Sequence, residues 1–275
     1  MKTSTQLKAL IRNLAEKKNI NPEVILRNFM LERLLERISV SKYKNNFILK
    51  GGMLISAMVG IGTRATMDID TVLKKRNFSE ADIEAVIKEI LSIPIDDNVK
   101  LTFKKIEELH EEADYHGYRV SIEAVLDKTK QMIKIDVSTG DFVTPKEIRY
   151  DFQLMFENRS IPLMAYNVET VLAEKLETIL SRDITNTRMR DFYDIYVLTK
   201  THSFDKKIFK SALEKTSQNR NTTPQVAEAR SIIEAIETNF LMADLWKRYQ
   251  KKYAYAVDIT WPMAMDSVKR LSLLS

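Results

Sequence analysis

The chain contains no cysteine, so a disulfide framework and a cysteine-ligated metal site are both excluded. Its histidines (His110, His116 and His202) are scattered and form no ligand cluster, which argues against zinc. No apolar run approaches the roughly 18 residues of a membrane span, and the first residues lack the apolar segment of a signal peptide. We therefore expect a cytoplasmic protein with no membrane partner.

Two common nucleotide-binding motifs are also missing. The sequence has no G-K-[ST] of a Walker loop and no G-x-G-x-x-G dinucleotide fingerprint. What is present is the composition of an ordinary globular protein, with 44% hydrophobic and 29% charged residues in 275. The net charge of +5 is compatible with a polyanionic partner but does not identify one.

The chain divides into two parts by its periodicity. The first part, 1–165, alternates helical and strand patterns, and Asn21-Pro22 gives a strong helix start. Strands are expected at 46–50, 67–74, 100–105, 118–125, 132–138 and 160–165. The second part, 166–275, is helical throughout. We predict an α+β fold, with a mixed sheet flanked by helices followed by an all-α C-terminal domain.

The most informative motif is a D-x-D within an alternating stretch. Asp68 and Asp70 are two residues apart, so on a strand their side chains share a face, with Ile69 in the core behind them. Adjacent ionised carboxylates favour a cation between them, and Mg²⁺ takes one or two carboxylates plus substrate phosphates. The alternative is a strand edge with two solvated acids.

A glycine pair precedes the D-x-D by about sixteen residues. Gly51 and Gly52 lie between a strand-like and a helix-like segment, where the backbone can approach a ligand and the helix N-terminus can bind phosphate. A phosphate cradle followed by two metal-binding carboxylates indicates nucleoside triphosphate chemistry.

This layout resembles the nucleotidyltransferase superfamily that includes DNA polymerase β. The longer string, Phe47-Ile48-Leu49-Lys50-Gly51-Gly52 followed by Arg64-x-Thr66-x-Asp68-Ile69-Asp70, is similar to the AbiEii/AbiGii abortive-infection toxins. The resemblance implies a polymerase-β-like core and a nucleotide site formed by Lys50, Gly51, Gly52, Arg64, Thr66 and Lys175. Thr66 lies two residues before Asp68 and would share its strand face, so we expect Thr66 at the lip of the site. In some members of the family the hydroxyl residue here is modified, so the resemblance implies phosphorylation of Thr66.

A third carboxylate, Asp136, lies on a predicted strand whose other face is Ile133, Ile135 and Val137. The resemblance implies that Asp136 joins Asp68 and Asp70 as a metal ligand for Mg²⁺ or Mn²⁺. From spacing alone, Asp136 is a solvated strand acid.

The helical part contains a lysine, Lys175, that interrupts an apolar stripe, followed sixteen residues later by Arg190-Asp191-x-x-Asp194. From the residues alone, Lys175 extends its ammonium to water and the two acids form an internal salt-bridge network. The resemblance, which runs from about 46 to 198, implies instead that Lys175 and Asp191 are catalytic, with Arg190 and Asp194 supporting them.

The basic and aromatic residues from Trp246 to Tyr253 are compatible with RNA contact. More often such a segment is an amphipathic helix that has a solvated cationic face.

The resemblance implies a metal-dependent nucleotidyltransferase that acts as a bacteriostatic toxin. It would transfer a nucleoside monophosphate from an NTP to an acceptor, with tRNA or another RNA expected. A cognate antitoxin is implied, with no stable complex required, and we expect a monomer. The alternatives are nucleotidylation of a small molecule or protein, and a nucleotide-binding partner protein without turnover.

Overall fold

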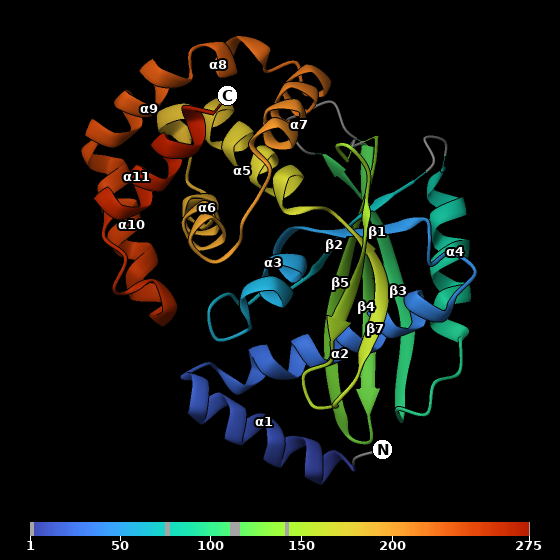
Figure 1. Cartoon of the computed structure of the whole chain (residues 1–275). Coiled ribbons are helices and arrows are strands. Elements are labelled where there is room, and N and C mark those ends of the chain that lie inside the picture. Colours follow the sequence, from blue (N-terminus) through green and yellow to red (C-terminus); the bar gives the residue numbers. More distant parts are fainter. Residues whose placement is uncertain (1–2, 75–77, 111–115, 141–142, 275) are drawn as a thin grey trace. The chain divides into compact units, whose positions relative to one another are not determined.

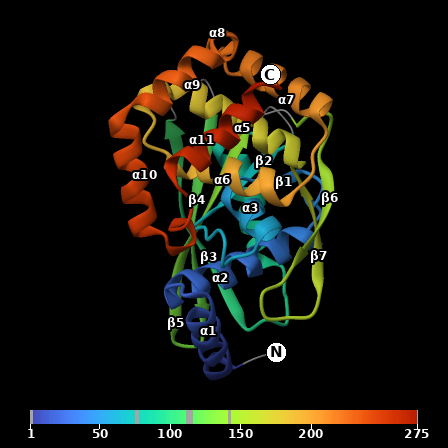
Figure 2. The same ribbon diagram turned by 60° about the vertical axis from the view of Figure 1, so that its left-hand side comes forward.

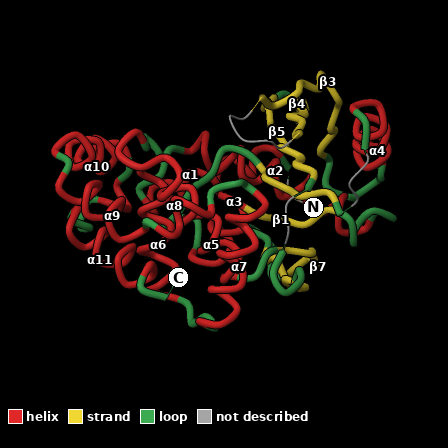
Figure 3. Tube along the Cα trace, turned by 90° about the horizontal axis from the view of Figure 1, so that it is seen from above, coloured by secondary structure: helices red, strands yellow, loops and turns green. Residues whose placement is uncertain are grey.

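The computed structural model describes residues 3–74, 78–110, 116–140 and 143–274. The chain forms two compact units. Unit 1 consists of 1–140 and 148–165, and unit 2 consists of 141–147 and 166–275. Figure 3 shows the strands in unit 1 and the helical character of unit 2. The predicted α+β class is therefore confirmed, with its mixed sheet, flanking helices and helical C-terminal part.

Unit 1 is built on a seven-stranded sheet with the order β3-β4-β5-β2-β1-β7-β6. The strands are β1 (Phe47–Lys50), β2 (Ile69–Leu73), β3 (Val99–His110), β4 (His116–Leu126), β5 (Thr129–Thr139), β6 (Ile148–Gln153) and β7 (Ser160–Ala165). The central pairs are β2 with β5 and β1 with β7, both parallel, and β1 with β2, antiparallel. The sequence did not predict β6, which pairs with β7 at the sheet edge.

In its described residues, unit 1 has the helices α1 (Ser4–Lys18), α2 (Pro22–Val40), α3 (Gly51–Val59) and α4 (Glu80–Ser92). The side chain of Asn21 caps α2 by accepting a hydrogen bond from the Glu23 N–H at 2.8 Å, as the Asn-Pro pair predicts. α1 packs against α2 (Figures 1 and 2), and α4 packs against β3 (Figure 1). α2 crosses the sheet and contacts β5 and β7.

The strand pattern of β5 explains which face of the sheet is buried. Ile133, Ile135 and Val137 are completely buried, whereas Lys134 is exposed and Asp136 is half-buried. This alternation matches the predicted one, and it places the face that carries Asp136 away from the apolar core.

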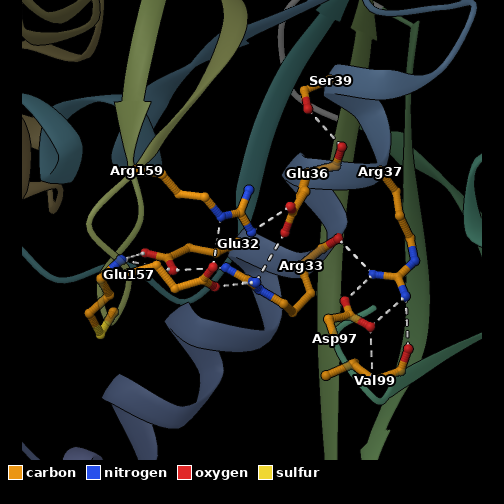
Figure 4. A network of polar contacts seen from close by, with 10 residues as sticks. Glu32, Arg33, Glu36, Arg37, Ser39, Asp97, Val99, Glu157 and Arg159 are labelled. Atoms are coloured by element: carbon orange, nitrogen blue, oxygen red, sulfur yellow. Dashed lines mark hydrogen bonds and ion pairs between the residues drawn. The ribbon is translucent and has the colours of Figure 1, made fainter. Parts of the chain in front are cut away.

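A cluster of acidic and basic side chains, most of them buried, lies along the second half of α2 (Figure 4), and we call it the α2 network. It consists of Glu32, Arg33, Glu36, Arg37, Asp97, Glu157 and Arg159. Arg33 reaches Glu36 at 3.0 Å and Glu157 at 2.8 Å, although its side chain is only 2% exposed. Arg37 donates two bonds to Asp97, at 2.6 and 3.0 Å. The network therefore fixes α2 to the segments that precede β3 and β7.

Unit 2 contains the helices α5 (Val168–Arg182), α6 (Met189–Thr201), α7 (Lys206–Asn219), α8 (Thr223–Ala227), α9 (Ala229–Thr238), α10 (Phe240–Lys252) and α11 (Trp261–Ser272), and two 3₁₀ turns, η1 (Asp183–Thr185) and η2 (Ala254–Ala256). α5 packs against both α6 and α7, and α6 packs against α11. Trp246 of α10 lies in the core, where its indole N–H donates to the Ile259 carbonyl at 2.8 Å.

Candidate active site

The glycine pair lies at the junction of β1 and α3. Gly51 has a φ of +62°, and a Cβ at this position would overlap the Asp70 carboxylate. A Cβ on Gly52 would lie 2.5 Å from Oγ1 of Thr66. The N–H of Gly52 donates to Oδ2 of Asp70 at 3.2 Å. The start of α3 and the second aspartate are therefore in direct contact, and a side chain at either glycine would disturb this arrangement.

The D-x-D straddles the start of β2. Asp68 lies in the bend before the strand, which begins at Ile69 rather than at the predicted residue 67. Asp68 is therefore not positioned by strand pairing. Its carboxylate Oδ1 accepts a hydrogen bond from the Thr66 hydroxyl at 3.3 Å. Both aspartates are partly exposed, while Ile69 between them is completely buried, as predicted.

Side chains hold the segment before Asp68 by hydrogen bonds to its backbone carbonyls. Asn28 of α2 donates to the Thr66 carbonyl at 2.8 Å, and Arg64 donates to the Ala65 carbonyl at 2.6 Å. Arg64 is 2% exposed and Thr66 is 1% exposed. The expectation that Thr66 lies at the lip of the site is therefore wrong, because its side chain is enclosed between Gly52 and the Asp68 loop. A buried hydroxyl is also poorly placed for modification in the folded protein.

A row of charged side chains crosses four neighbouring strands, and we call it the charged row. It consists of Lys50 in β1, Asp70 in β2, Asp136 in β5 and Arg119 in β4, each directly paired with the next. Directly paired residues project from the same face of a sheet. Behind this face, Ile69, Ile135 and Val120 form the parallel apolar row and are completely buried.

Arg119 is the member of this row that the sequence did not predict. Its Nε and Nη2 donate to the two oxygens of Asp136 at 2.8 and 2.7 Å. The hydrogen bonds to Asp136, together with the charges of Asp136, Asp68 and Asp70, raise the pKa of Arg119 above its ordinary value. The guanidinium is thus a fixed positive charge beside the D-x-D.

The residues present suit a small metal site. Among the described residues, no group of three or more His, Cys, Asp or Glu side chains is close enough to hold an ion. Asp68 and Asp70 alone match Mg²⁺ or Mn²⁺ sites that take one or two carboxylates and are completed by substrate phosphates. Both oxygens of Asp136 accept hydrogen bonds from Arg119, and the role of Asp136 as a third metal ligand stays a prediction.

The predicted lysine and aspartates of unit 2 form a buried ion cluster. Nζ of Lys175 lies 2.5 Å from Oδ1 of Asp191 and 3.1 Å from Oδ2 of Asp194. Nε of Arg188 lies 3.2 Å from the other oxygen of Asp191. The side chains of Asp191 and Asp194 are 2% and 0% exposed. The expected internal salt-bridge network is therefore confirmed, and the interpretation in which Lys175 extends to water is wrong.

Arg190 turns to an aromatic partner. Its Nη2 donates to the Tyr253 hydroxyl at 3.0 Å, and its guanidinium carbon lies 5.5 Å from the centre of the Tyr253 ring. The ring of Tyr253 in turn stacks on Tyr255, with their centres 5.3 Å apart. Arg190 thus joins α6 to the end of α10 within unit 2.

The last motif, on α10, behaves as an amphipathic helix. Trp246 and Tyr249 are buried, whereas the basic side chains are exposed: Lys247, Arg248, Lys251 and Lys252. A solvated cationic face is therefore confirmed, and Trp246 is unavailable for stacking on a nucleic-acid base. RNA contact by the cationic face stays a prediction.

No helix in the described parts of the chain combines the length and the apolar character needed to cross a membrane. A comparison with curated proteins finds no match.

Solved structures provide fold-level similarity. The nucleotidyltransferase toxin MenT4 from Mycobacterium tuberculosis shares 15% identity, with 98% of this chain and 94% of that chain covered, at a TM-score of 0.58. The Helicobacter pylori protein JHP933 shares 17% identity over 91% of this chain and 94% of that chain, at a TM-score of 0.48. At these identities the similarity concerns the fold, and the lower score adds nothing to the argument.

A family model gives the stronger result, because it spans both units. The model of the nucleotidyl transferase AbiEii toxin, of type IV toxin–antitoxin systems, matches residues 33–267. This range contains the glycine pair, the D-x-D, the charged row and the Lys175 cluster. The chain therefore belongs to the AbiEii nucleotidyltransferase toxin family of type IV toxin–antitoxin systems.

Proposed function

We propose that this toxin transfers a nucleoside monophosphate from an NTP to an RNA, with the 3′ end of tRNA as the expected acceptor. The observation that carries the proposal is the contact between the glycine pair and the D-x-D. The Gly52 N–H donates to Asp70, and a Cβ on Gly51 would displace that carboxylate. Such close approach of a helix N-terminus to two carboxylates is suited to a metal-bound triphosphate.

In the proposed reaction, Asp68 and Asp70 hold a Mg²⁺ or Mn²⁺ ion together with the triphosphate. When bound, the ion neutralises phosphate charge and stabilises the charge that develops at the α-phosphorus. Gly51 and Gly52 allow the phosphates to approach the start of α3. The acceptor hydroxyl forms a bond to the α-phosphorus and gives its proton to water, while the bond to the β-phosphate breaks and pyrophosphate leaves.

The polar residues around these groups receive the following proposed roles. Lys50 would bind phosphate from the end of the charged row, and Arg64 and Thr66 would hold the loop that carries Asp68. In unit 2, Lys175 would stabilise the negative charge of the phosphates, with Asp191 keeping its ammonium charged and oriented. Arg190 and Asp194 would support that cluster. We propose two domains, 1–165 and 166–275, with residues from both needed for activity.

The biological setting follows from the same proposal. Modification of tRNA would stop translation, and this would serve abortive infection and defence against phage. The substrates place the reaction in the cytoplasm. The antitoxin that the family implies would counteract the toxin without a stable complex, and the toxin would act as a monomer.

The decisive experiment supplies the protein with each of the four α-labelled NTPs, Mg²⁺ and total RNA, and follows the label. Label in the tRNA band, dependent on metal and abolished in Asp70→Asn, supports the proposal. Label in the protein itself or in a small molecule would identify the alternative acceptors. No label with any NTP would indicate a protein that binds nucleotides without turnover.

A thermal melt provides an independent test of nucleotide binding. A ligand present at a hundred times its dissociation constant stabilises a fold by about 2.7 kcal/mol. We expect one of the four NTPs to raise the melting temperature in the presence of Mg²⁺ and to have little effect with EDTA. An identical melt with all four NTPs at millimolar concentration would contradict a preformed site.

A further inference from the structure

We propose that Arg119 is a phosphate-binding residue of the nucleotide site, and that Asp136 is the positioning residue for Arg119 rather than a metal ligand. This inference rests on the proposed function, since it names how the same site recognises the triphosphate. It concerns unit 1 alone, where every residue of the charged row belongs to one sheet.

The first step is the register of the strands. Arg119 pairs directly with Asp136, and Asp136 pairs directly with Asp70. Neighbouring strands are separated by about 4.8 Å, so Arg119 originates two strand spacings from the metal-binding carboxylate and on the same face. The Arg119 side chain covers the first of these two spacings, because its guanidinium contacts Asp136.

The second step is how the guanidinium is used. Asp136 accepts from Nε and Nη2, which are two of the nitrogens on one edge of the group. Nη1 has no acceptor among the residues that the structure describes. The Arg119 side chain is 33% exposed, whereas that of Asp136 is 16% exposed. A planar guanidinium clamped along one edge presents its remaining donors in a fixed direction, the arrangement that proteins use for phosphate oxygens.

The third step excludes the simplest alternative. Both oxygens of Asp136 already accept charge-assisted hydrogen bonds from Arg119, and a metal ion at Asp136 would lie beside this guanidinium, a like charge. Asp70 accepts a hydrogen bond from the Gly52 N–H, and Asp68 accepts one from the Thr66 hydroxyl, and both of these donors are uncharged. The charges are therefore divided, with Asp136 holding the arginine and the D-x-D holding the ion.

The test separates metal binding from phosphate binding. Mn²⁺ alone is titrated and followed by electron paramagnetic resonance, and inorganic tripolyphosphate is titrated in saturating Mn²⁺ and followed by calorimetry. The variants are Arg119→Gln, Asp136→Asn and the double variant, with Arg119→Lys as the conservative replacement. The matched control is Lys104→Gln, because Lys104 forms a similar cross-strand ion pair with Glu123 at 2.8 Å.

We expect Arg119→Gln and Asp136→Asn each to weaken tripolyphosphate binding about tenfold to a hundredfold, the range of a charged hydrogen bond. The double variant should be no weaker than Arg119→Gln, because Asp136 acts through Arg119. Arg119→Lys should recover part of the affinity. The affinity for Mn²⁺ alone should change less than about twofold in all of them, and Lys104→Gln should match the wild type.

Two results would overturn the inference. If Asp136→Asn weakens Mn²⁺ binding as strongly as Asp70→Asn does, Asp136 is a metal ligand. If Arg119→Gln binds tripolyphosphate as well as the wild type or better, the arginine merely neutralises Asp136. A failure of the proposed function has its own pattern. In that case Asp70→Asn would bind Mn²⁺ like the wild type, and the inference would fall with it.

Discussion

Unit 1 contains two groups of opposite charges that look alike in the sequence and differ in the structure. In the α2 network, Arg33 and Arg37 are 2% and 4% exposed. Arg33 contacts three carboxylates, and Arg37 contacts the Asp97 carboxylate and two backbone carbonyls. In the charged row, Arg119 is 33% exposed and contacts one carboxylate along one edge. A closed network fixes a helix, whereas an open row keeps its donors and acceptors partly exposed to a ligand.

The two groups are connected by α2 itself. The α2 network fixes the second half of the helix, and Asn28 in its first half donates to the Thr66 carbonyl close to Asp68. The α2 network, which we call the closed group, thus stabilises the helix that holds the loop before Asp68. The charged row together with Asp68 is the open group. We expect substitutions in the first to affect stability, and substitutions in the second to affect ligands and turnover.

The largest effect is expected in the open group. Asp70→Asn and Asp68→Asn should each reduce transfer to background, because several kcal/mol of metal-dependent stabilisation is removed from the transition state. The amide of Asp70→Asn retains an oxygen for the Gly52 N–H, so the melting temperature should barely change. Transfer is measured with the labelled NTP, and Asp151→Asn, at an exposed position on β6, is the control. Full turnover by a folded Asp70→Asn protein would refute the metal site.

The sequence predicted the open group in part, and the reason is physical. Gly51, Gly52 and the D-x-D lie within one β-α-β stretch, where local spacing determines which side chains meet. Arg119 and Asp136 come together through the pairing of β4 with β5. The sequence pattern does not specify which residue of one strand pairs with which residue of the other. The expectation for Thr66 failed for a similar reason, since the position of its segment depends on Asn28 from α2.

The closed group was not predicted at all. The residues from Glu32 to Arg37 resemble ordinary charged positions on an amphipathic helix, because their partners Asp97, Glu157 and Arg159 lie 60 or more positions away. By contrast, the salt bridges of Lys175 with Asp191 and Asp194 have a local signal, since buried acids one helical turn apart need a cation. Helix signals such as Asn21-Pro22 are local too, and they predicted the helix start correctly.

The next largest effect is expected in the closed group. Arg33→Met should destabilise unit 1 by about 3–5 kcal/mol, because it removes the buried cation between Glu36 and Glu157 and leaves these carboxylates only the more exposed Arg159. The measurement is the free energy of unfolding by denaturant. Arg270→Met, which breaks an exposed pair with Asp266, should cost about 0.5 kcal/mol or less. If Arg33→Met abolished transfer in protein that remains folded, the α2 network would affect activity as well as stability, which contradicts the division between the two groups.

The closed group should also make stability depend on pH. Burial raises the pKa of Glu32 to about 8 from its ordinary value of 4.5, against the opposing bond from the Met155 N–H. Between these two values the folded state holds a proton that the unfolded state has released. Stability from this group is therefore complete below the lower value and falls as pH rises from there through the higher one, by up to about 1.4 kcal/mol per unit.

Glu32→Gln tests this pH dependence. The amide keeps an oxygen for the Met155 N–H and cannot ionise, so the fall in unfolding free energy between about pH 5 and 8 should become shallower. Glu234→Gln, on the exposed face of α9, serves as the control. Equal slopes for Glu32→Gln and the wild type would show that Glu32 ionises normally in the folded protein.

A smaller effect is expected at Thr66, in the loop that Asn28 of α2 holds and that carries Asp68. Thr66→Val keeps the shape but removes the hydroxyl that donates to Asp68 at 3.3 Å. Transfer should fall about tenfold while stability changes by about 1 kcal/mol or less. Thr66→Ser, which keeps the hydroxyl, should retain most of the activity. Equal rates for Thr66→Val and the wild type would show that Asp68 needs no orientation from this residue.

The smallest effect concerns a third charged group, the cationic face of α10. This face either binds a ligand, as we propose for the charged row, or serves only the fold, as the α2 network does. Its side chains are exposed, yet Arg248 already pairs with Asp244 at 2.6 Å. Trp246 and Tyr249 beneath are buried, so this face can offer charge to phosphates but no indole to bases. If it tracks an RNA backbone, replacing the basic side chains Lys247, Arg248, Lys251 and Lys252 with alanine should weaken RNA binding.

The salt dependence of RNA binding makes this last prediction sharper than an affinity alone. Each phosphate that the four basic side chains of α10 neutralise should add about 0.7–0.9 to the slope of log affinity against log salt, and the quadruple alanine variant should show a correspondingly shallower slope. NTP binding, which we assign to the charged row of unit 1, should not change. Equal RNA affinity and equal salt slope in the quadruple variant would show that the cationic face of α10 contacts solvent and does not bind RNA. The nucleotide site would then still stand, because it rests on the residues between 46 and 198.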